Sequence, residues 1–112
     1  MNVWERKSFK ITVSSRARTD ILEAASYIQQ TQSAQASSQW KTALVNAIRS
    51  LGEMPNRCPR TSESDDIGLE IRALLHRPHR ILFRVVEDKK MVEIMRVYHE
   101  KREPLVAEDI VE

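Results

Sequence analysis

The stretch that most constrains the fold of this chain is residues 68–99, which read GLEIRALLHRPHRILFRVVEDKKMVEIMRVYH. Val, Ile and Phe are concentrated in it, and these residues favour the pleated geometry of β-strands. The pattern predicts three consecutive strands, at residues 69–74, 79–87 and 91–98, joined by two short connections. Connections this short join antiparallel strands, so we expect a three-stranded meander.

The middle strand of this meander alternates in polarity. Because side chains along a strand change face at every residue, Ile81, Phe83 and Val85 share one face and form a candidate core. We expect Arg72 of the preceding strand to lie beside the opposite face. That face is half apolar and half cationic, and its residues are Arg80, Leu82, Arg84 and Val86.

Two helices are predicted before the meander. Residues 8–13 alternate between polar and apolar side chains, which indicates a short strand, and Ser14 and Ser15 are suited to cap the helix that follows. Apolar residues then recur along one helical stripe, at Ala17, Ile21, Ala24, Ala25 and Ile28. After a polar break at residues 29–33, a second stripe contains Ala36, Trp40, Ala43, Leu44, Ala47, Ile48 and Leu51. Pro55 ends this helix, and the short link between the helices predicts an antiparallel hairpin.

The predicted order is therefore β-α-α-β-β-β, an α+β fold with the helical hairpin packed on one face of a small, mostly antiparallel sheet. We expect one domain over residues 1–112, with a core at about 8–104, flexible N-terminal residues and a flexible C-terminal tail. Residues 56–67 (NRCPRTSESDDI) are predicted to be a surface loop. This arrangement leaves the arginine-bearing face open.

Composition limits the classes of function. The net charge is +2 over 112 residues, which is too small an excess to indicate nucleic-acid binding by itself. Cys58 is the only cysteine, we find no signal peptide or membrane span, and a cytoplasmic protein is expected. We also predict no metal site and no cofactor, since the three histidines (His76, His79 and His99) lack the spacing of metal ligands and two glycines cannot form a phosphate loop.

Several short motifs in order resemble the RelE/ParE toxin superfamily across about residues 8–104. They are A-x-x-D-I at 17–21, Tyr27 with Ile28, W-x-x-x-L-x-x-A-I-x-x-L at 40–51, G-x-E-I-R at 68–72, H-R-I-L-F-R-V at 79–85 and V-Y-H-x-x-R-E at 97–103. The resemblance implies the toxin of a type II toxin–antitoxin module, with the same β-α-α-β-β-β core. It also implies a small antitoxin, encoded beside the toxin, that wraps the domain.

The superfamily contains two kinds of toxin. ParE-like members inhibit DNA gyrase by binding, whereas RelE-like members are ribosome-dependent mRNA endonucleases that need no metal. In the second case the resemblance points to Arg72, Arg80, His99 and Arg102 as catalytic residues. The low net charge, and a tail after Arg102 with no tyrosine, favour the ParE-like reading, in which the protein is not an enzyme.

Partner contacts are expected at two places. An amphipathic helix of the antitoxin fits the outer groove of the hairpin at residues 15–54, and an extended stretch fits a sheet edge. Acidic antitoxin side chains would meet the arginine-bearing face. The candidate partner-binding residues are Arg72, Arg80, Leu82 and Arg84.

Overall fold

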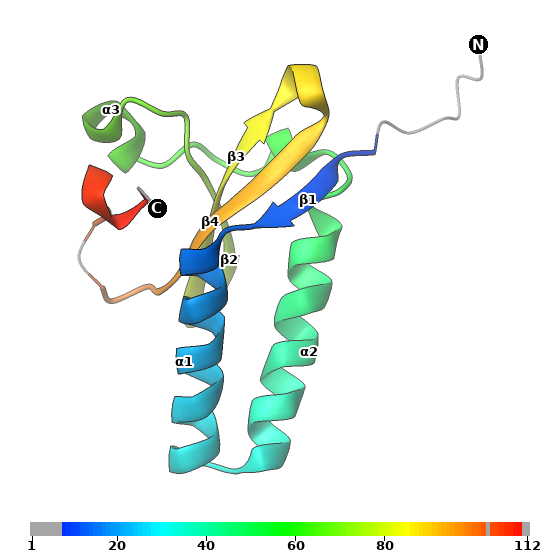
Figure 1. Cartoon of the computed structure of the whole chain (residues 1–112), viewed down its shortest axis with the longest axis vertical. Helices are drawn as coiled ribbons and strands as arrows, with labels where there is room; N and C mark the ends of the chain where they lie inside the picture. Colours follow the sequence, from blue (N-terminus) through cyan, green and yellow to red (C-terminus); the bar gives the residue numbers. More distant parts are fainter. Residues whose placement is uncertain (1–7, 103, 111–112) are drawn as a thin grey trace.

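The computed structural model describes residues 8–102 and 104–110, and Figure 1 shows its arrangement. The elements are β1 (Lys10–Val13), α1 (Ser15–Thr31), α2 (Ala34–Ser50), α3 (Glu63–Ile67), β2 (Arg72–His76), β3 (His79–Val86) and β4 (Met91–His99). The predicted α+β class and β-α-α-β-β-β order are confirmed, and α3 is an addition to them. The N-terminal residues expected to be flexible, 1–7, lie outside the described residues.

The four strands form one sheet in the order β1-β4-β3-β2. Strands β2, β3 and β4 make the predicted antiparallel meander, with His76 opposite His79 at the first turn. Strand β1 runs parallel to β4, with Lys10 opposite Met91, and so lies at an edge of the sheet. Periodicity could not decide this position, because alternation describes one strand and not its neighbour.

The helical hairpin forms as the capping residues predict. Ser14 Oγ accepts from the N–H of Ala17 at 3.1 Å, and Ser33 Oγ accepts from the N–H of Ala36 at 2.9 Å, so each helix begins with a filled cap. The break between the helices is only Gln32 and Ser33, shorter than expected. The two antiparallel helices lie side by side and extend past one end of the sheet (Figure 1).

The hairpin covers one face of the sheet, which we call the hairpin face. Leu44 and Ile48 of α2, and Leu51 just after it, pack there against Ile81 and Phe83 of β3, as the two periodicities predict. From β4, the hairpin face receives Val92, Ile94 and Val97, which complete this first core.

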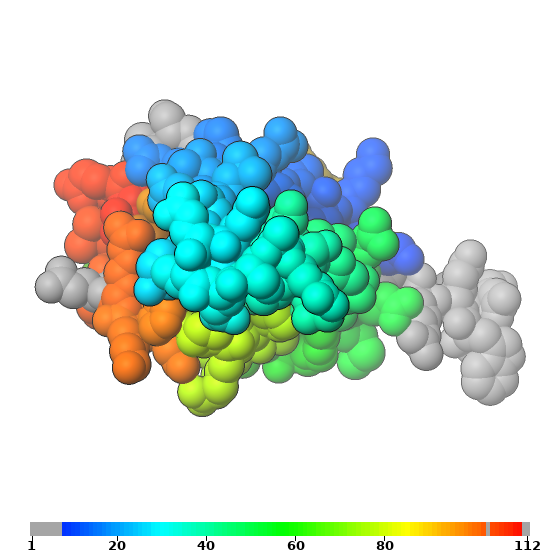
Figure 2. All heavy atoms as spheres, turned by 90° about the horizontal axis from the view of Figure 1, so that it is seen from below, coloured from blue at the N-terminus to red at the C-terminus, as the bar shows by residue number. Residues whose placement is uncertain are grey.

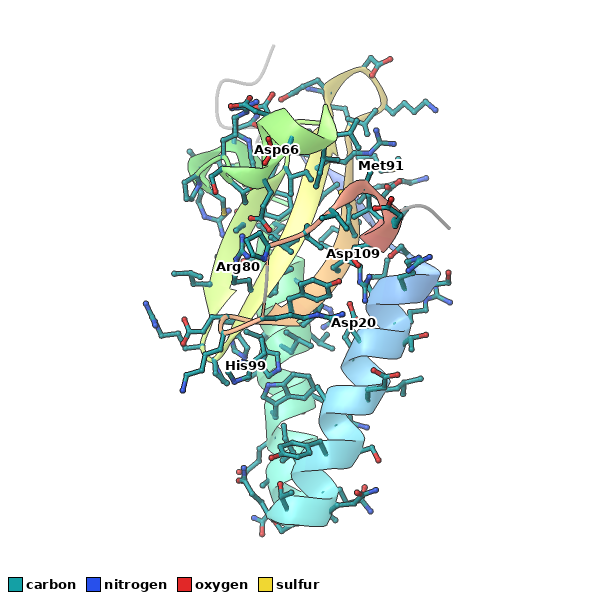
Figure 3. The ribbon with its side chains drawn as sticks, turned by 90° about the vertical axis from the view of Figure 1, so that its left-hand side faces the viewer. Asp20, Asp66, Arg80, Met91, His99 and Asp109 are labelled. Atoms are coloured by element: carbon teal, nitrogen blue, oxygen red, sulfur yellow. The ribbon has the colours of Figure 1, made fainter. Side chains whose placement is uncertain are left out.

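The opposite face, which we call the second face, is not open, so that prediction is wrong. Residues 56–67 are not a simple loop, because α3 forms at 63–67 and covers part of this face. Residues 104–110, expected to be a flexible tail, cross it as well, and Figure 3 shows both segments in front of the sheet. Beneath them lies a second core of Ile71, Leu82, Met95, Tyr98 and Leu105.

Side-chain hydroxyls explain why α3 returns to the sheet. Ser64 Oγ donates to the carbonyl of Ile71 at 3.0 Å and accepts from its N–H at 2.9 Å. The N–H of Thr61 also donates to the Ile71 carbonyl, at 2.7 Å. A stretch rich in Ser, Thr and Asp therefore behaves as an anchored cover and not as a solvated loop.

Strand β4 contains a bulge that supplies the second core. Leu82 lies opposite Arg96 and Phe83 opposite Ile94, so Met95 has no partner on β3. The extra residue allows Met95 to pack in the second core, while Ile94 and Val97 remain in the first. No helix among the described residues is long and apolar enough to cross a membrane.

Candidate functional site

Arg72 does not lie where the strand pattern placed it. It is opposite Phe83, a residue of the first core, so its side chain is on the hairpin face and not beside Arg80. One of its nitrogens, Nη1, donates to the Cys58 carbonyl at 2.6 Å, and Nη2 contacts Glu70 Oε1 at 2.7 Å. Cys58 itself is buried, and burial raises the pKa of its thiol, consistent with a packed and unreactive side chain.

Arg80 is on the second face, as predicted, but its charge is already paired. Its Nη2 contacts Glu63 Oε1 at 2.5 Å, and Glu63 is only 5% exposed. The other oxygen, Glu63 Oε2, accepts from the N–H of Leu105 at 2.7 Å. Burial of this carboxyl works to raise its pKa, but the hydrogen bonds from Arg80 and Leu105 outweigh burial and hold the pKa below its usual value.

The remaining partner-binding candidates differ in accessibility. Leu82 is fully buried in the second core. The Arg84 side chain is 37% exposed and lies 3.4 Å from Glu93 on the neighbouring strand. A role in partner binding stays a prediction for Leu82 and Arg84, as it does for Arg72 and Arg80. On the second face, a partner could reach Arg84 without displacing α3 or residues 104–110.

A groove opens at the edge of the sheet, between the helical hairpin, the start of β3 and the end of β4. Its volume is about 500 Å³. Figure 2, seen from the tip of the hairpin, shows the β2–β3 turn beside the end of β4, and these segments join through a hydrogen bond from the Glu100 N–H to the Pro78 carbonyl. Aromatic and apolar side chains dominate the lining, which includes Ala24, Tyr27, Ile28, Trp40, Val97 and Tyr98.

Two histidines face each other in this groove. His79 and His99 are register partners, their ring centroids are 5.6 Å apart, and the His79 ring is 5.2 Å from Trp40. Burial, helped by the neighbouring His99 and His76, lowers the pKa of His79, so its ring is neutral near pH 7. His99 is exposed, and its Nδ1 accepts from the N–H of Lys101 at 3.1 Å.

Tyr98 lies on the other face from His99, as alternation predicts. The Arg96 and Arg102 guanidinium groups lie 4.5 Å and 4.1 Å from the centroid of its ring. Arg96 also forms a buried ion pair with Asp20 of α1, with two nitrogen–oxygen distances of 2.8 Å. Asp20 therefore fixes α1 to the end of β4, and Figure 3 shows it on the helix, facing the sheet.

The four residues named for a ribonuclease are not brought together. Arg72 and His99 are on the hairpin face, whereas Arg80 is on the second face and is paired with Glu63. Arg102 stacks on Tyr98. Within the described ranges, no three His, Cys, Asp or Glu side chains are placed to hold a metal ion.

Sequence reasoning missed the two carboxylates that organise these arginines. Asp20 had a signal, because it falls three residues after Ala17 and four before Ala24, on the buried side of a helix. A carboxylate at such a position needs a cationic partner. Glu63 had no comparable signal, since nothing in SESDD distinguishes one acidic residue from the next.

Comparisons with known proteins agree with this architecture. The family described as the ParE toxin of the type II toxin–antitoxin system parDE matches residues 11–104. A chain of the chromosomal ParDE toxin–antitoxin system from P. aeruginosa is similar at 20% identity, covering 83% of this chain and 97% of that chain with a TM-score of 0.70. A chain of the RelBE2 toxin–antitoxin complex from Mycobacterium tuberculosis is 19% identical, covering 85% and 97% with a TM-score of 0.57. No curated protein sequence matches this chain significantly.

Proposed function

Because this chain belongs to the ParE toxin family of type II toxin–antitoxin systems, we propose that it arrests growth by binding DNA gyrase and that a cognate antitoxin neutralises it. Its site of action would be the cytoplasm, where gyrase meets DNA. The protein acts in this proposal through contact and shape, with no bond made or broken. The similar solved chains come from toxin–antitoxin assemblies, which supports an antitoxin partner.

The observation that carries the proposal is the separation of Arg80 from His99. Cleaving RNA without a metal requires an acid–base group and a cation at the same phosphate. Arg80 and His99 have side chains on different faces of the sheet, and the Arg80 charge is met by Glu63. The geometry therefore favours a binding protein over the mRNA endonuclease.

The distribution of charge supports the same choice. A protein that binds ribosomal RNA gains affinity from many unpaired Lys and Arg side chains, because each phosphate contact releases counterions. Here the net charge is +2, and two central arginines, Arg80 and Arg96, are paired internally with Glu63 and Asp20. Little cationic surface is left over the middle of the sheet for phosphate contacts.

The test is to express the protein in bacteria and to identify what stops first. Gyrase inhibition predicts filamentous cells, a DNA-damage response and intact mRNA, and purified protein should block supercoiling by purified gyrase. Co-expression of the antitoxin encoded beside the gene should restore growth. Rapid arrest of translation, with mRNA cut at codon positions, would overturn the gyrase proposal in favour of the ribosome-dependent endonuclease.

A matched pair of variants separates the two activities in the same assay. His99→Gln removes the acid–base candidate of the endonuclease, so unchanged toxicity is expected if the target is gyrase. Tyr27→Ala alters a side chain that is 68% exposed on the other wall of the same groove and controls for general damage to that surface. Loss of toxicity in His99→Gln alone would contradict the proposal.

A further inference from the structure

Two imidazole rings lie next to each other in the groove, and the strand register places them there. His79 begins β3 and His99 ends β4, and the two residues are directly opposite in the antiparallel pair. Opposed side chains in such a pair share one face, with Cβ atoms about 4.5–5.5 Å apart. Figure 3 shows His99 at the end of the sheet beside the helices. Linear spacing does not indicate this pair, because the two histidines become neighbours only when the meander folds.

The separation of the two rings suits a shared metal ion. Their centroids are 5.6 Å apart, and the ring planes are inclined by 73°. A bond from a metal ion to an imidazole nitrogen is about 2.0–2.1 Å long, so two imidazoles on one tetrahedral ion have ring centroids roughly 5 Å apart. A small rotation of the exposed His99 side chain closes the difference. The pair is therefore close to the geometry of a two-imidazole chelate.

His79 presents one ring nitrogen to the groove and keeps the other inside. Its Nδ1 is buried without a hydrogen-bond partner, which leaves Nε2 as the nitrogen available to a ligand. The residue is only 9% exposed, and its ring centroid lies 5.2 Å from that of Trp40. The face of an aromatic ring accepts weakly from an N–H, so Trp40 favours a proton on Nδ1 and a lone pair on Nε2. That neutral tautomer is the one that ligates a metal through Nε2.

The surroundings of His79 keep its ring free of a competing proton near pH 7. Burial, helped by the neighbouring His99 and His76, lowers the pKa of His79, and a metal ion binds only the unprotonated ring. The charged groups around the groove also tolerate a cation, because positive and negative charges balance there. They are Glu23, Arg102 and Asp20, the last of which is already paired with Arg96.

His99 can turn its ring toward an ion at little cost. It is exposed, and the hydrogen bond that its Nδ1 accepts from the Lys101 N–H, at 3.1 Å, is exposed too, so water can replace it. The groove, at about 500 Å³, has room for an ion and its water ligands. Among the described residues no three His, Cys, Asp or Glu side chains converge. The protein therefore supplies two ligands, and water completes the coordination.

We propose that His79 and His99 bind a divalent late transition-metal ion, such as Zn²⁺ or Cu²⁺, through their Nε2 atoms in the groove. Imidazole nitrogen suits ions of this class, whereas Mg²⁺ and Ca²⁺ prefer oxygen ligands. The bound ion links the first residue of β3 to the last residue of β4, and so ties the β2–β3 turn to the end of the meander. The site rests on strand register and ring geometry, and it does not depend on gyrase being the target.

The test is a metal titration of the full-length protein, purified without a histidine tag and stripped of metals with a chelator. Isothermal titration calorimetry near pH 7 with ZnCl₂ and with CuSO₄ should show saturable binding of one ion per chain, and MgCl₂ should show none. Cu²⁺ should bind more tightly than Zn²⁺, as the Irving–Williams order requires. The electron paramagnetic resonance spectrum of the Cu²⁺ form should contain hyperfine structure from two nitrogen ligands. Absence of saturable binding by both ions would overturn the proposal.

A matched pair of variants locates the ion. His99→Gln removes an exposed ligand and should weaken Zn²⁺ binding by about tenfold or more, since even outer-shell contacts of a metal site change affinity by about that factor. His76→Gln is the control, because His76 is the other register partner of His79, and it should bind as the wild type does. Circular dichroism confirms that each variant has folded. Wild-type affinity in His99→Gln, or an equal loss in His76→Gln, would overturn the assignment.

Thermal melting gives a second readout of the same site. An ion that binds only the folded protein raises the Tm as its concentration rises. The rise with Zn²⁺ should be absent in His79→Gln and His99→Gln, each compared with its own metal-free Tm. It should also shrink below about pH 6.5, because protons compete for the imidazoles. A Tm that rises equally with Zn²⁺ in the wild type and in His99→Gln would refute the site.

Discussion

The hairpin face and the second face belong to the same four strands, but they are buried by different means. On the hairpin face, two helices of 17 residues each cover apolar side chains with other apolar side chains. On the second face, a helix of five residues and the C-terminal segment do the covering, and buried charges lie at its margins. The difference teaches that long helices are held mainly by apolar burial with one ion pair, Asp20–Arg96, at their margin, whereas the short cover depends on specific polar anchors at Glu63 and Ser64.

That difference has an energetic consequence. Apolar burial stabilises roughly in proportion to area and has no single essential atom. A buried ion pair is different, because removal of one partner leaves an unpaired charge behind. The two faces should therefore respond differently to the same kinds of change, and the following experiments compare them from the largest effect to the smallest.

The largest effect is expected on the hairpin face. Leu51→Ala removes a fully buried side chain from the first core and should lower the free energy of unfolding by about 2–5 kcal/mol, since it leaves a cavity between helix and sheet. Urea denaturation followed by circular dichroism measures this change in the free energy of unfolding. Val45→Ala, at a 42% exposed position of α2, is the control and should change the free energy of unfolding by about 0.5 kcal/mol or less. A loss below about 1 kcal/mol for Leu51→Ala would break the comparison.

The second effect tests the anchor of the second face. Glu63→Ala leaves Arg80 without its carboxylate and should cost about 2 kcal/mol, less than a fully buried pair because the Arg80 side chain is 20% exposed. Replacing both residues, as Glu63→Leu with Arg80→Leu, should recover most of that loss, because no charge is then left unpaired. If the double variant is as unstable as Glu63→Ala, the loss in Glu63→Ala does not come from the unpaired Arg80 charge.

The pH dependence of the second face follows from the same carboxylate. The pKa of Glu63 is lower in the folded protein than in the unfolded chain, where it is about 4.3. Its contribution to stability is therefore present above pH 4.3 and is lost as the pH falls through the folded-state pKa. Unfolding free energies of the wild type and Glu63→Gln, measured from pH 7 to pH 3, should converge at the acidic end. A constant difference would contradict the assignment.

The smallest effect concerns the buried histidine of the hairpin face. The folded-state pKa of His79 is lowered, while the unfolded chain titrates near 6.5, so the unfolded state binds more protons just below that pH. His79 should thus make the protein less stable as the pH falls from about 6.5, a higher window than that of Glu63. His79→Gln should flatten the stability curve between pH 7 and pH 5. Identical slopes in the wild type and His79→Gln would exclude this role.

The parts of the fold that the sequence predicts well are those in which apolar residues repeat regularly over many positions. The apolar stripe from Ala36 to Leu51 repeats over four helical turns, so it predicts both the second helix and its buried side. Helix α3 has five residues and no apolar repeat, and its position depends on hydroxyl contacts between Ser64 and Ile71 that no local pattern encodes. The candidate site is harder to predict than the fold, because the environment of each arginine depends on carboxylates that are distant in the sequence.

The error at Arg72 had a different cause and was avoidable. A hairpin with an even number of turn residues pairs even-numbered positions with odd-numbered ones, as His76 with His79 and Arg72 with Phe83. The predicted turn already had an even length, so Arg72 belonged on the side of Phe83. The pairing of Asp20 with Arg96 could not be predicted in this way, because the two residues are 76 positions apart and no turn length relates them.

The bulge at Met95 allows the two faces to vary independently. Without that one residue, β4 would alternate regularly, and Ile94 and Val97 would still point toward the helices. The second face would lose the Met95 side chain, and the start of α1 would lose the carbonyl to which Ser14 Oγ donates at 2.9 Å. A one-residue change in length at this point would therefore remodel the second face, while the apolar core under the hairpin stays constant.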